Sequence, residues 1–402
     1  MDTTVAGIAS VVVAQLRSAG YMESTIGQYE KTIKALTAFL AERGEEYTPE
    51  LGAQFAAMTV SPRTGRFSAQ RRFDYRRLVA LFDSYVLTGR VDLSMRKRGG
   101  GGAVPGAGEF VELLVVWEAE MARRGLAPAT CEAYRRMARG YLVFLESRGV
   151  QTLREADGAS VLEFLESLTD RWARSSLFWV ITNLRPFLQF TERIDLIESV
   201  GMAGVKRPHR IVPVLSEADE VSVMQVCATG LVAARDAAIA LLALTTGIRS
   251  CDLVALRLGD IDWRSQTASL VQQKTHNPLT VPLMPVVVDR LATYVLAERP
   301  DSPDDHVFLR CKAPHTCLSD HAAIHRITAG VFARAGVTEF KGGTALLRHN
   351  AASRLLRASV PLPTISAVLG HASADSTNTY LSVDRDRLLG CVLDVPAPAV
   401  RS

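Results

Sequence analysis

Residues 246–253 read Thr-Gly-Ile-Arg-Ser-Cys-Asp-Leu, directly after an apolar helical pattern over 232–246. Glycine readily adopts the left-handed backbone conformation that ends a helix, so Gly247 predicts that one helix stops here and another begins. Arg249 and Asp252 then lie at the start of the second helix. An arginine in such a place is usually one half of a surface ion pair. The stretch therefore gains meaning only together with others.

Three later stretches carry further polar residues that could act in a functional site. Lys274 lies in a predicted turn between two strand-like runs. Leu347-Arg348-His349 lies in a helix that is predicted to begin near Thr344. Leu369-Gly370-His371 is followed nine positions later by Tyr380. Each is common when taken singly, because a tyrosine at helical spacing, for example, usually belongs to a core.

The C-terminal half is predicted to be a mainly helical α+β domain with a small antiparallel sheet. Its strands are expected at 267–272 and 279–283, with helices at 216–228, 232–246, 286–298, 320–335, 344–357, 362–369 and 374–381. It contains no Gly-rich phosphate loop, no HExxH and no GxSxG. Functions that depend on ATP, nicotinamide or a metalloprotease centre therefore lack support.

Composition indicates a globular protein with real cores. The chain has 402 residues, of which 48% are hydrophobic and 22% charged, and this excludes a mostly disordered protein. The 46 Lys and Arg against 42 Asp and Glu leave a net charge of +4, too small to name a partner. No apolar run is long enough to span a membrane, and the N-terminal segment lacks the basic flank of a signal peptide.

The six cysteines are scattered, which argues against a disulfide scaffold and favours a reducing compartment. We therefore expect a cytoplasmic protein of the bacterial cytosol or nucleoid. Cys311, His315, Cys317 and His321 lie close enough in sequence to be zinc ligands. However, neither pair has the usual short Cys-x2-4-Cys spacing. An ordinary loop is favoured, and no metal or other cofactor is expected.

Two Gly- and Pro-rich segments predict linkers. Residues 99–108 follow the basic run Arg96-Lys97-Arg98 and begin with consecutive glycines, and residues 201–213 are basic and without pattern. Glycine runs do not hold a helix or strand together, so boundaries belong here. The predicted domains are 1–98, 109–200 and 214–402, the last with a C-terminal tail.

The first two domains resemble one another at an offset of 125 − 20 = 105 residues. Each copy is predicted to have a helix capped by Ser24 or Thr25, or by Thr130 in the second copy, and stopped by a glycine. A duplicated module of four or five helices explains the match, and chance similarity between amphipathic helices is the alternative. The aligned residues are Gly20 with Gly125, Thr25 with Thr130, Tyr29 with Tyr134, Phe39-Leu40 with Phe144-Leu145, and Arg43-Gly44 with Arg148-Gly149.

Arginines alternate with aromatic residues in one part of each copy. This mixture suits contacts with phosphates and with bases or sugars, although a solvated arginine face is the common alternative. The predicted DNA-binding residues are Arg63, Arg66, Arg71, Arg72, Arg76 and Arg77 in the first copy, Arg171 and Arg174 in the second, and Lys206, Arg207 and Arg210 in the second linker.

Jointly, the stretches resemble the tyrosine recombinases, the family of phage integrases and Xer-type site-specific recombinases. The motifs that carry the resemblance, in the family's order, are the TGIRxxDL box at 246–253, the hairpin lysine Lys274, the LLRH box at 346–349, the LGH box at 369–371 and the final Tyr380. The resemblance covers 211–385 and extends to 109–200, which is similar to the family's core-binding module. It implies two helical SAM-like N-terminal modules before an α+β catalytic domain, with 1–98 binding arm-type sites or duplicating the core-binding module.

The resemblance also implies roles for individual residues. Arg249 and Arg348 would hold the scissile phosphate of DNA, and Tyr380 would attack it to form a 3′-phosphotyrosyl bond. Lys274 would give a proton to the departing 5′-hydroxyl, and His371 would donate a hydrogen bond to the phosphate or orient Tyr380. Two arginines suit this task because guanidinium groups make forked, charge-assisted contacts with phosphate oxygens.

Position 345 departs from the family's pattern. The family usually has a histidine three residues before its second arginine, and this chain has Ala345. Alanine can neither accept the tyrosine proton nor contact the phosphate, so impaired catalysis is expected. An engineered substitution, a natural variant that uses water or another side chain, and an inactive paralogue all remain open. Asp252 would brace Arg249, and His349 would pack or support the site indirectly.

The implied function is site-specific DNA recombination, for integration, excision or transposition of a mobile element, without ATP or metal. The implied partners are double-stranded DNA with inverted-repeat core sites and further copies of the chain, as a dimer on one site and a tetramer in synapsis. Accessory DNA-bending proteins or a partner recombinase are further candidates. The alternatives are a type IB topoisomerase or telomere resolvase, and a catalytically silent DNA-binding or architectural paralogue.

Overall fold

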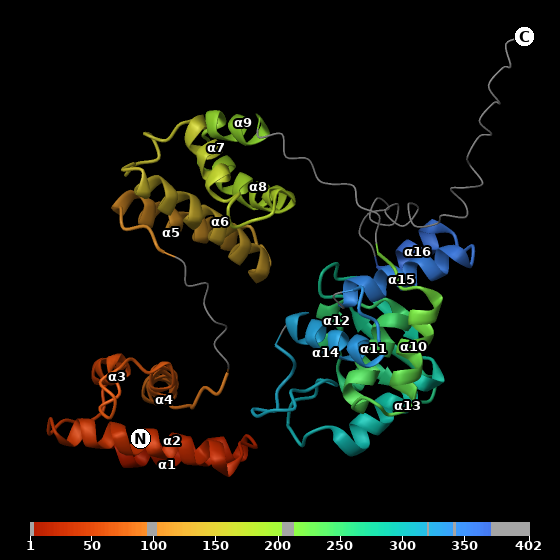
Figure 1. Ribbon diagram of the computed structural model, residues 1–402, viewed down its shortest axis with the longest axis horizontal. Helices are drawn as coiled ribbons and strands as arrows, with labels where there is room; N and C mark the ends of the chain where they lie inside the picture. The colour runs from red at the N-terminus through yellow and green to blue at the C-terminus, as the bar shows by residue number, and fades with distance from the viewer. Residues whose placement is uncertain (1–3, 95–102, 203–212, 320, 341–342, 371–402) are drawn as a thin grey trace, which may run out of the picture. The chain divides into compact units, whose positions relative to one another are not determined.

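The computed structural model describes residues 4–94, 103–202, 213–319, 321–340 and 343–370 (Figure 1). The chain divides into two compact units, Met1–Ser94 with Ile211–Ser402 and Met95–Arg210. The described residues are mainly helical and include one small three-stranded antiparallel sheet in the C-terminal half. This confirms the predicted fold class of that half. None of the described helices is both long and apolar enough to cross a bilayer.

Residues 4–94 form four helices around their own hydrophobic core. Ser68 caps the fourth of them, because its hydroxyl accepts a hydrogen bond from the backbone N–H of Arg71 at 3.2 Å. Gly89 ends that helix at a φ of +72°. The helices are α1 (Val5–Ser18), α2 (Glu23–Ala41), α3 (Pro49–Ala57) and α4 (Ala69–Thr88), and their core includes Ile8, Leu36, Phe55 and Phe82.

Residues 103–202 form five helices around a second core. Its largest buried side chains are Trp117, Tyr141 and Phe187. The helices are α5 (Gly108–Arg123), α6 (Pro128–Ser147), α7 (Gly158–Ser167), α8 (Arg174–Phe190) and α9 (Ile194–Met202). The starts of α2 and α6 differ by 128 − 23 = 105 residues, and those of α4 and α8 differ by 174 − 69 = 105 residues.

The predicted caps of α2 and α6 are wrong. The N-cap residues are Met22 and Ala127, neither of which makes a side-chain capping bond, and Thr130 lies inside α6. The proline at 128 explains the earlier start of α6, since its fixed φ suits the first helical position. Local geometry at the helix start therefore outweighed the preference of threonine for the cap.

Residues 213–370 form the third part of the chain, whose centre is α11. This helix is buried on nearly all sides, and its small alanines let neighbouring helices approach closely. The helices are α10 (Glu217–Ala228), α11 (Ala234–Thr246), α12 (Ser250–Ala255), α13 (Pro285–Thr293), α14 (His321–Arg334), α15 (Thr344–Arg357) and α16 (Leu362–Leu369). A 3-10 turn (Leu258–Asp260) follows α12, and a π-helical turn (Tyr294–Glu298) follows α13.

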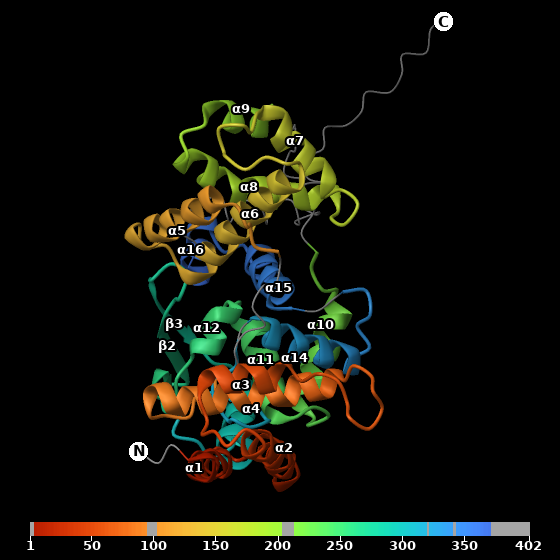
Figure 2. The ribbon, with the colours of Figure 1, turned by 90° about the vertical axis from the view of Figure 1, so that its left-hand side faces the viewer.

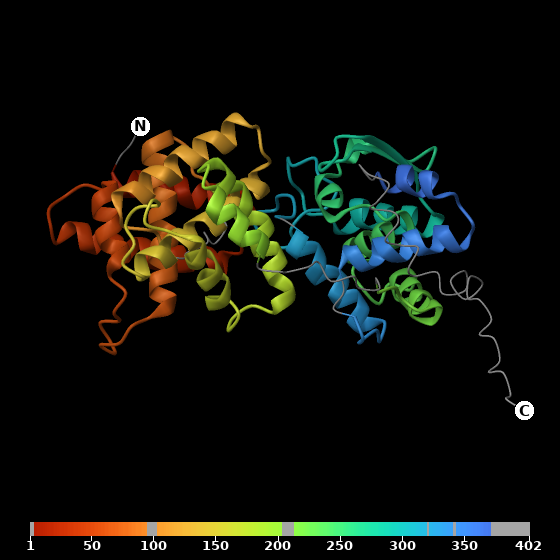
Figure 3. The same ribbon diagram turned by 90° about the horizontal axis from the view of Figure 1, so that it is seen from above.

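The sheet lies beside these helices (Figures 2 and 3). It consists of β1 (Ile261–Asp262), β2 (Thr267–Val271) and β3 (Pro278–Pro282), in the order β1-β2-β3. Ala268 pairs with Val281, and both side chains are buried in the core. This register leaves the residues between β2 and β3 as the turn that was predicted to carry Lys274. The predicted helix at 374–381 lies outside the described residues.

Candidate active site

The junction between α11 and α12 holds the first arginine of the site. Gly247 ends α11 at a φ of +67°, and Arg249 is the N-cap of α12. A Cβ atom on Gly247 would come within 2.8 Å of a Leu369 methyl carbon and 3.2 Å of the Ala351 Cβ. Glycine therefore serves the turn and also lets α15 and α16 approach it closely. The TGIR stretch thus contacts α15, which carries the LLRH box, and the end of α16, where the LGH box begins.

Arg348 on α15 connects two of these segments. Its side chain is buried, with 8% of the residue surface exposed. Its Nη1 donates to the carbonyl oxygen of Gly247 at 2.8 Å, and its Nη2 donates to that of Leu369 at 2.6 Å. A buried charge needs such partners. The second arginine is consequently held between the end of α11 and the end of α16.

One terminal nitrogen of the Arg249 guanidinium makes a hydrogen bond, and the other has no partner among the described residues. Its Nη2 donates to the carbonyl oxygen of Gly370 at 2.8 Å. Its Nη1 is buried and has no hydrogen-bond partner in the described part of the chain. Leaving a buried donor unsatisfied costs about 1–3 kcal/mol, and more when the group is charged. An anionic ligand oxygen would relieve this cost.

Lys274 lies in the turn between β2 and β3, and its side chain is exposed. The turn closes through a hydrogen bond from the Gln272 N–H to the Asn277 carbonyl at 3.0 Å, and another from the His276 N–H to the Gln272 carbonyl at 2.8 Å. The buried side chain of Gln272 donates to the Leu369 carbonyl at 3.3 Å. The turn is therefore attached to the same carbonyl that binds Arg348.

The carboxylate of Asp252, which was predicted to brace Arg249, binds the β2–β3 hairpin. One of its carboxylate oxygens accepts a hydrogen bond from the Gln273 N–H at 2.7 Å, and the other is buried without a partner among the described residues. Among the described residues, the Asp252 carboxylate makes no hydrogen bond or ion pair with the Arg249 guanidinium; the two residues are joined only through the backbone, where the Asp252 N–H donates to the Arg249 carbonyl at 3.0 Å. Because Gln273 follows the end of β2, the carboxylate of Asp252 in the first turn of α12 holds the start of the hairpin turn.

Ala345 is exposed in the first turn of α15, and His349 is half-buried on the same helix. Burial, with a smaller contribution from the Arg348 charge, lowers the pKa of His349 below its usual value. Its surroundings therefore favour the neutral form of the imidazole. His371 and Tyr380, together with Lys206, Arg207 and Arg210, lie outside the described residues.

The arginines predicted to bind DNA differ from most other arginines of the two helical parts. Arg71 donates to the Val60 carbonyl at 2.7 Å, and Arg77 to the Tyr21 hydroxyl at 3.2 Å. By contrast, Arg123 and Arg124 are paired with Glu120 at 2.7 and 2.6 Å. Among the described residues, no carboxylate lies within ion-pair distance of Arg63, Arg66, Arg71, Arg72, Arg76, Arg77, Arg171 or Arg174.

Aromatic rings accompany these unpaired arginines. Phe67 and Phe73 are 59% and 56% exposed, and the Arg72 guanidinium lies 5.5 Å from the Phe67 ring centre. Trp172 and Trp179 stack with their ring centres 5.8 Å apart. Exposed aromatic side chains beside unneutralised arginines are typical of nucleic-acid surfaces.

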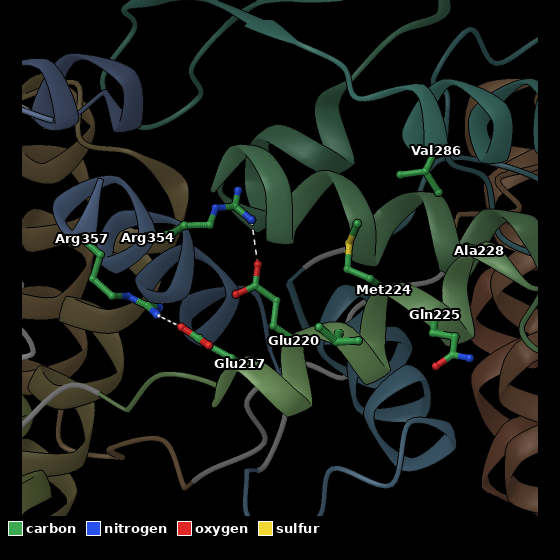
Figure 4. Close-up of a pocket in the computed structure, with 9 residues that line it drawn as sticks. Glu217, Glu220, Met224, Gln225, Ala228, Val286, Arg354 and Arg357 are labelled. Carbon is green, nitrogen blue, oxygen red and sulfur yellow. Dashed lines mark hydrogen bonds and ion pairs between the residues drawn. The ribbon is translucent and has the colours of Figure 1, made fainter. Parts of the chain in front are cut away.

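A groove of about 830 Å³ lies on α10, α13 and α15, and its cations are already neutralised (Figure 4). Arg354 pairs with Glu220 at 2.7 Å, and Arg357 pairs with Glu217 at 3.3 Å. The groove therefore offers no free cation for a phosphate.

The four residues that lie close enough in sequence to be zinc ligands do not come together among the described residues. They are Cys311, His315, Cys317 and His321. Cys317 instead lies near Asp304 and His306, with one potential ligand atom of each within 4.8 Å of the others. The Asp304 carboxylate is occupied by the His306 Nδ1 at 2.5 Å and by the Cys317 N–H at 2.8 Å. Through these bonds Asp304 connects the loop that contains His306 to the loop that contains Cys317.

Sequence patterns missed the backbone carbonyls of Gly247, Leu369 and Gly370, and also Gln272. Every residue has a backbone carbonyl, so residue types do not show which carbonyls bind a side chain. The only signal in the sequence is glycine at 247 and 370, which allows other segments to approach the backbone closely. Gln272 ends a strand-like run, where a polar residue is ordinary. Its burial depends on α16, which is distant in sequence.

Comparisons with known proteins identify relatives of this chain. Residues 213–387 match the phage integrase family. The chain is 31% identical over 285 residues to the putative integrase/recombinase y4rF of Sinorhizobium fredii, covering 69% of this chain and 67% of the relative. It is 29% identical over 288 residues to the tyrosine recombinase XerC of Mesorhizobium japonicum, covering 68% and 91%.

A lambda integrase tetramer bound to a Holliday junction has a similar fold. The TM-score is 0.51 at 17% identity, over 80% of this chain and 90% of that one. The matching family region and the 31% identical relative lead to one conclusion: the chain belongs to the phage integrase family of tyrosine recombinases.

Proposed function

We propose that the chain is a site-specific recombinase that cuts and rejoins DNA through a 3′-phosphotyrosyl intermediate. The observation that carries this proposal is the partly satisfied arginine pair. Arg249 and Arg348 come from segments far apart in sequence, yet both bind carbonyls at the end of α16. The buried Nη1 of Arg249 has no partner among the described residues, as a site for an anionic oxygen requires.

The proposed reaction follows from the charge on a phosphodiester. Arg249 and Arg348 stabilise the additional negative charge of the pentacoordinate transition state. The phenolic oxygen of Tyr380 forms a bond to phosphorus while the bond from phosphorus to the 5′-oxygen breaks. Lys274 gives its proton to that oxygen, and the phenol proton passes to a base or to water. His371 donates a hydrogen bond to the phosphate or orients the phenol.

The protein–tyrosine phosphodiester keeps the energy of the broken bond, so the reverse attack by a 5′-hydroxyl rejoins the strand. We include a mobile element as the biological context of this reaction. The support is the similarity to the putative integrase/recombinase y4rF. A dimer on one core site and a tetramer in synapsis complete the proposal, by analogy with the lambda integrase tetramer on a Holliday junction.

The helical parts are proposed to be two copies of one DNA-binding module, in domains 1–98 and 109–200. The identical 105-residue spacing between the starts of two pairs of helices supports duplication. The unpaired arginines and exposed aromatic rings in α4 and around the start of α8 support DNA contact. The first copy then extends the contact with DNA beyond the core site.

A catalytically silent DNA-binding protein is the second candidate, and Ala345 is the observation that favours it. Covalent capture separates the two functions. The protein is incubated with fragmented genomic DNA, denatured, and tested for DNA that remains attached. We expect an adduct with the parent chain and none with Tyr380→Phe, because the phenyl ring has no nucleophile.

The Tyr380→Phe variant is also expected to retain DNA binding in a gel-shift assay. An adduct that persists in this variant would reject Tyr380 as the nucleophile. If neither the parent chain nor Ala345→His forms any adduct while both bind DNA, the silent binder is supported instead.

The unpaired arginines of α4 and the preceding loop predict a change in salt dependence. Removing Arg66, Arg72 and Arg76 together should flatten the slope of log affinity against log salt by about 0.9 for each phosphate that the variant no longer neutralises. Fluorescence anisotropy with a random-sequence duplex over a salt series measures this slope. Arg123→Ala is the control, because Arg123 is already paired with Glu120. An unchanged slope in the triple variant would exclude this surface from DNA binding.

A further inference from the structure

We propose that Gln272 is a positioning residue that holds the turn carrying Lys274 against the phosphate-binding arginines. The inference rests on the proposed function, since it assigns Lys274 to proton transfer. Lys274 itself is exposed, and the described residues offer its ammonium group no hydrogen bond or ion pair. Its position must therefore come from the turn to which it belongs.

Gln272 engages that turn at several points. Its backbone N–H and carbonyl bind Asn277 and His276, which closes the turn. Its side-chain Oε1 accepts a hydrogen bond from the Thr275 hydroxyl at 2.6 Å. The residue is completely buried, so water does not replace these bonds when they are broken. One side chain thus fixes the residue that follows Lys274.

The same side chain attaches the turn to the arginines. Its Nε2 donates to the Leu369 carbonyl at 3.3 Å, and Arg348 donates to that same carbonyl at 2.6 Å. A Cβ atom on Gly370 would lie only 1.9 Å from the Gln272 Oε1. Glycine at 370 therefore admits the amide to this place. The Leu369 carbonyl is therefore the common contact of the turn and of Arg348.

Displacing Lys274 has a specific chemical consequence. Proton transfer depends steeply on distance, and a misplacement of about 1 Å can cost on the order of 10²-fold in rate. The 5′-oxygen needs a proton as it leaves. A bridging sulfur at the same position does not, because a thiol is far more acidic, with a pKa of about 8.5. A loss of proton transfer therefore slows cleavage of the oxygen substrate alone.

The experiment compares Gln272→Met, which keeps the length of the side chain, with Thr275→Val, which removes only the hydroxyl. Gln273→Ala is the control, because its side-chain amide makes only a 3.4 Å bond to the Val271 carbonyl. Substrates are two duplexes of the DNA sequence recovered by covalent capture, one normal and one with a bridging 5′-sulfur at the cleaved phosphate. Adduct formation on each is measured for the full chain, alongside Lys274→Ala.

Both Gln272→Met and Thr275→Val are expected to slow adduct formation on the normal duplex, Gln272→Met by on the order of 10²-fold. Rates on the sulfur duplex should stay close to that of the parent chain. Equal losses on both duplexes, or no loss on either, would overturn the positioning role. If Lys274→Ala is not rescued by sulfur, the assignment of Lys274 has failed rather than that of Gln272.

Hydrogen exchange without DNA tests the structural half of the inference independently. The amides of 272–277 should exchange faster in Gln272→Met and Thr275→Val than in Gln273→Ala, while α11 stays protected. Unchanged exchange in the turn would overturn the inference. A parent chain that forms no adduct with either duplex would reject the proposed function, and the exchange result would still decide whether Gln272 holds the turn.

Discussion

Ala345→His is expected to increase the rate of covalent DNA cleavage by on the order of 10²-fold, the usual contribution of a well-placed general base. Position 345 is exposed in the first turn of α15, three residues before Arg348, so a histidine there reaches solvent without disturbing a core. Its neutral imidazole would accept the proton that Tyr380 loses. The measurement is single-turnover adduct formation on a suicide duplex.

The pH dependence gives this prediction a sign. Histidine accepts a proton only when it is neutral, and its usual pKa is about 6.5. The gain in Ala345→His should therefore be present above this pH and disappear as the pH falls below it. Ala345→Gln is the control, because it can hydrogen-bond the phosphate without accepting a proton. Equal rates in the parent chain and in Ala345→His would mean that water or another side chain performs this step.

Arg249→Ala is expected to reduce adduct formation by at least about 10²-fold, the usual cost of removing one donor that stabilises a transition state. The loss should appear in the chemical step, with DNA binding weakened far less, because many phosphate contacts share the binding energy. The fold should survive, since the Arg249 side chain makes a single hydrogen bond in the described part of the chain, to the Gly370 carbonyl.

Arg354→Ala is the matched control for Arg249→Ala. Arg354 is also an arginine of the C-terminal part, but its charge is neutralised by Glu220 at 2.7 Å. Arg249→Lys should fail nearly as completely as alanine, because its single nitrogen cannot occupy the positions of both Nη2, which binds the Gly370 carbonyl, and Nη1. Adduct formation that is insensitive to Arg249 would remove this arginine from the site.

Residue patterns located most of the C-terminal part correctly. Helices were predicted at 344–357 and 362–369, and α15 and α16 have these bounds. Both predicted strands are present within one residue. Such elements are readable because alternating or helical apolar patterns and glycine stops act locally. The helix predicted to begin after Gly247 is present as α12, whereas β1 was missed and the caps of α2 and α6 were wrong, because these depend on neighbouring structure.

The amino-acid sequence by itself indicated the family to which this chain belongs, because its arginine, lysine, histidine and tyrosine motifs follow the order of the tyrosine recombinases. It also determined that Ala345 breaks the pattern. Only the tertiary structure decided which groups hold Arg348 and the hairpin turn in place. The Asp252 carboxylate binds the hairpin rather than the Arg249 guanidinium, and Gln272 shares the Leu369 carbonyl with Arg348. Backbone carbonyls and long-range contacts of this kind arise from packing between distant segments, which residue order does not encode locally.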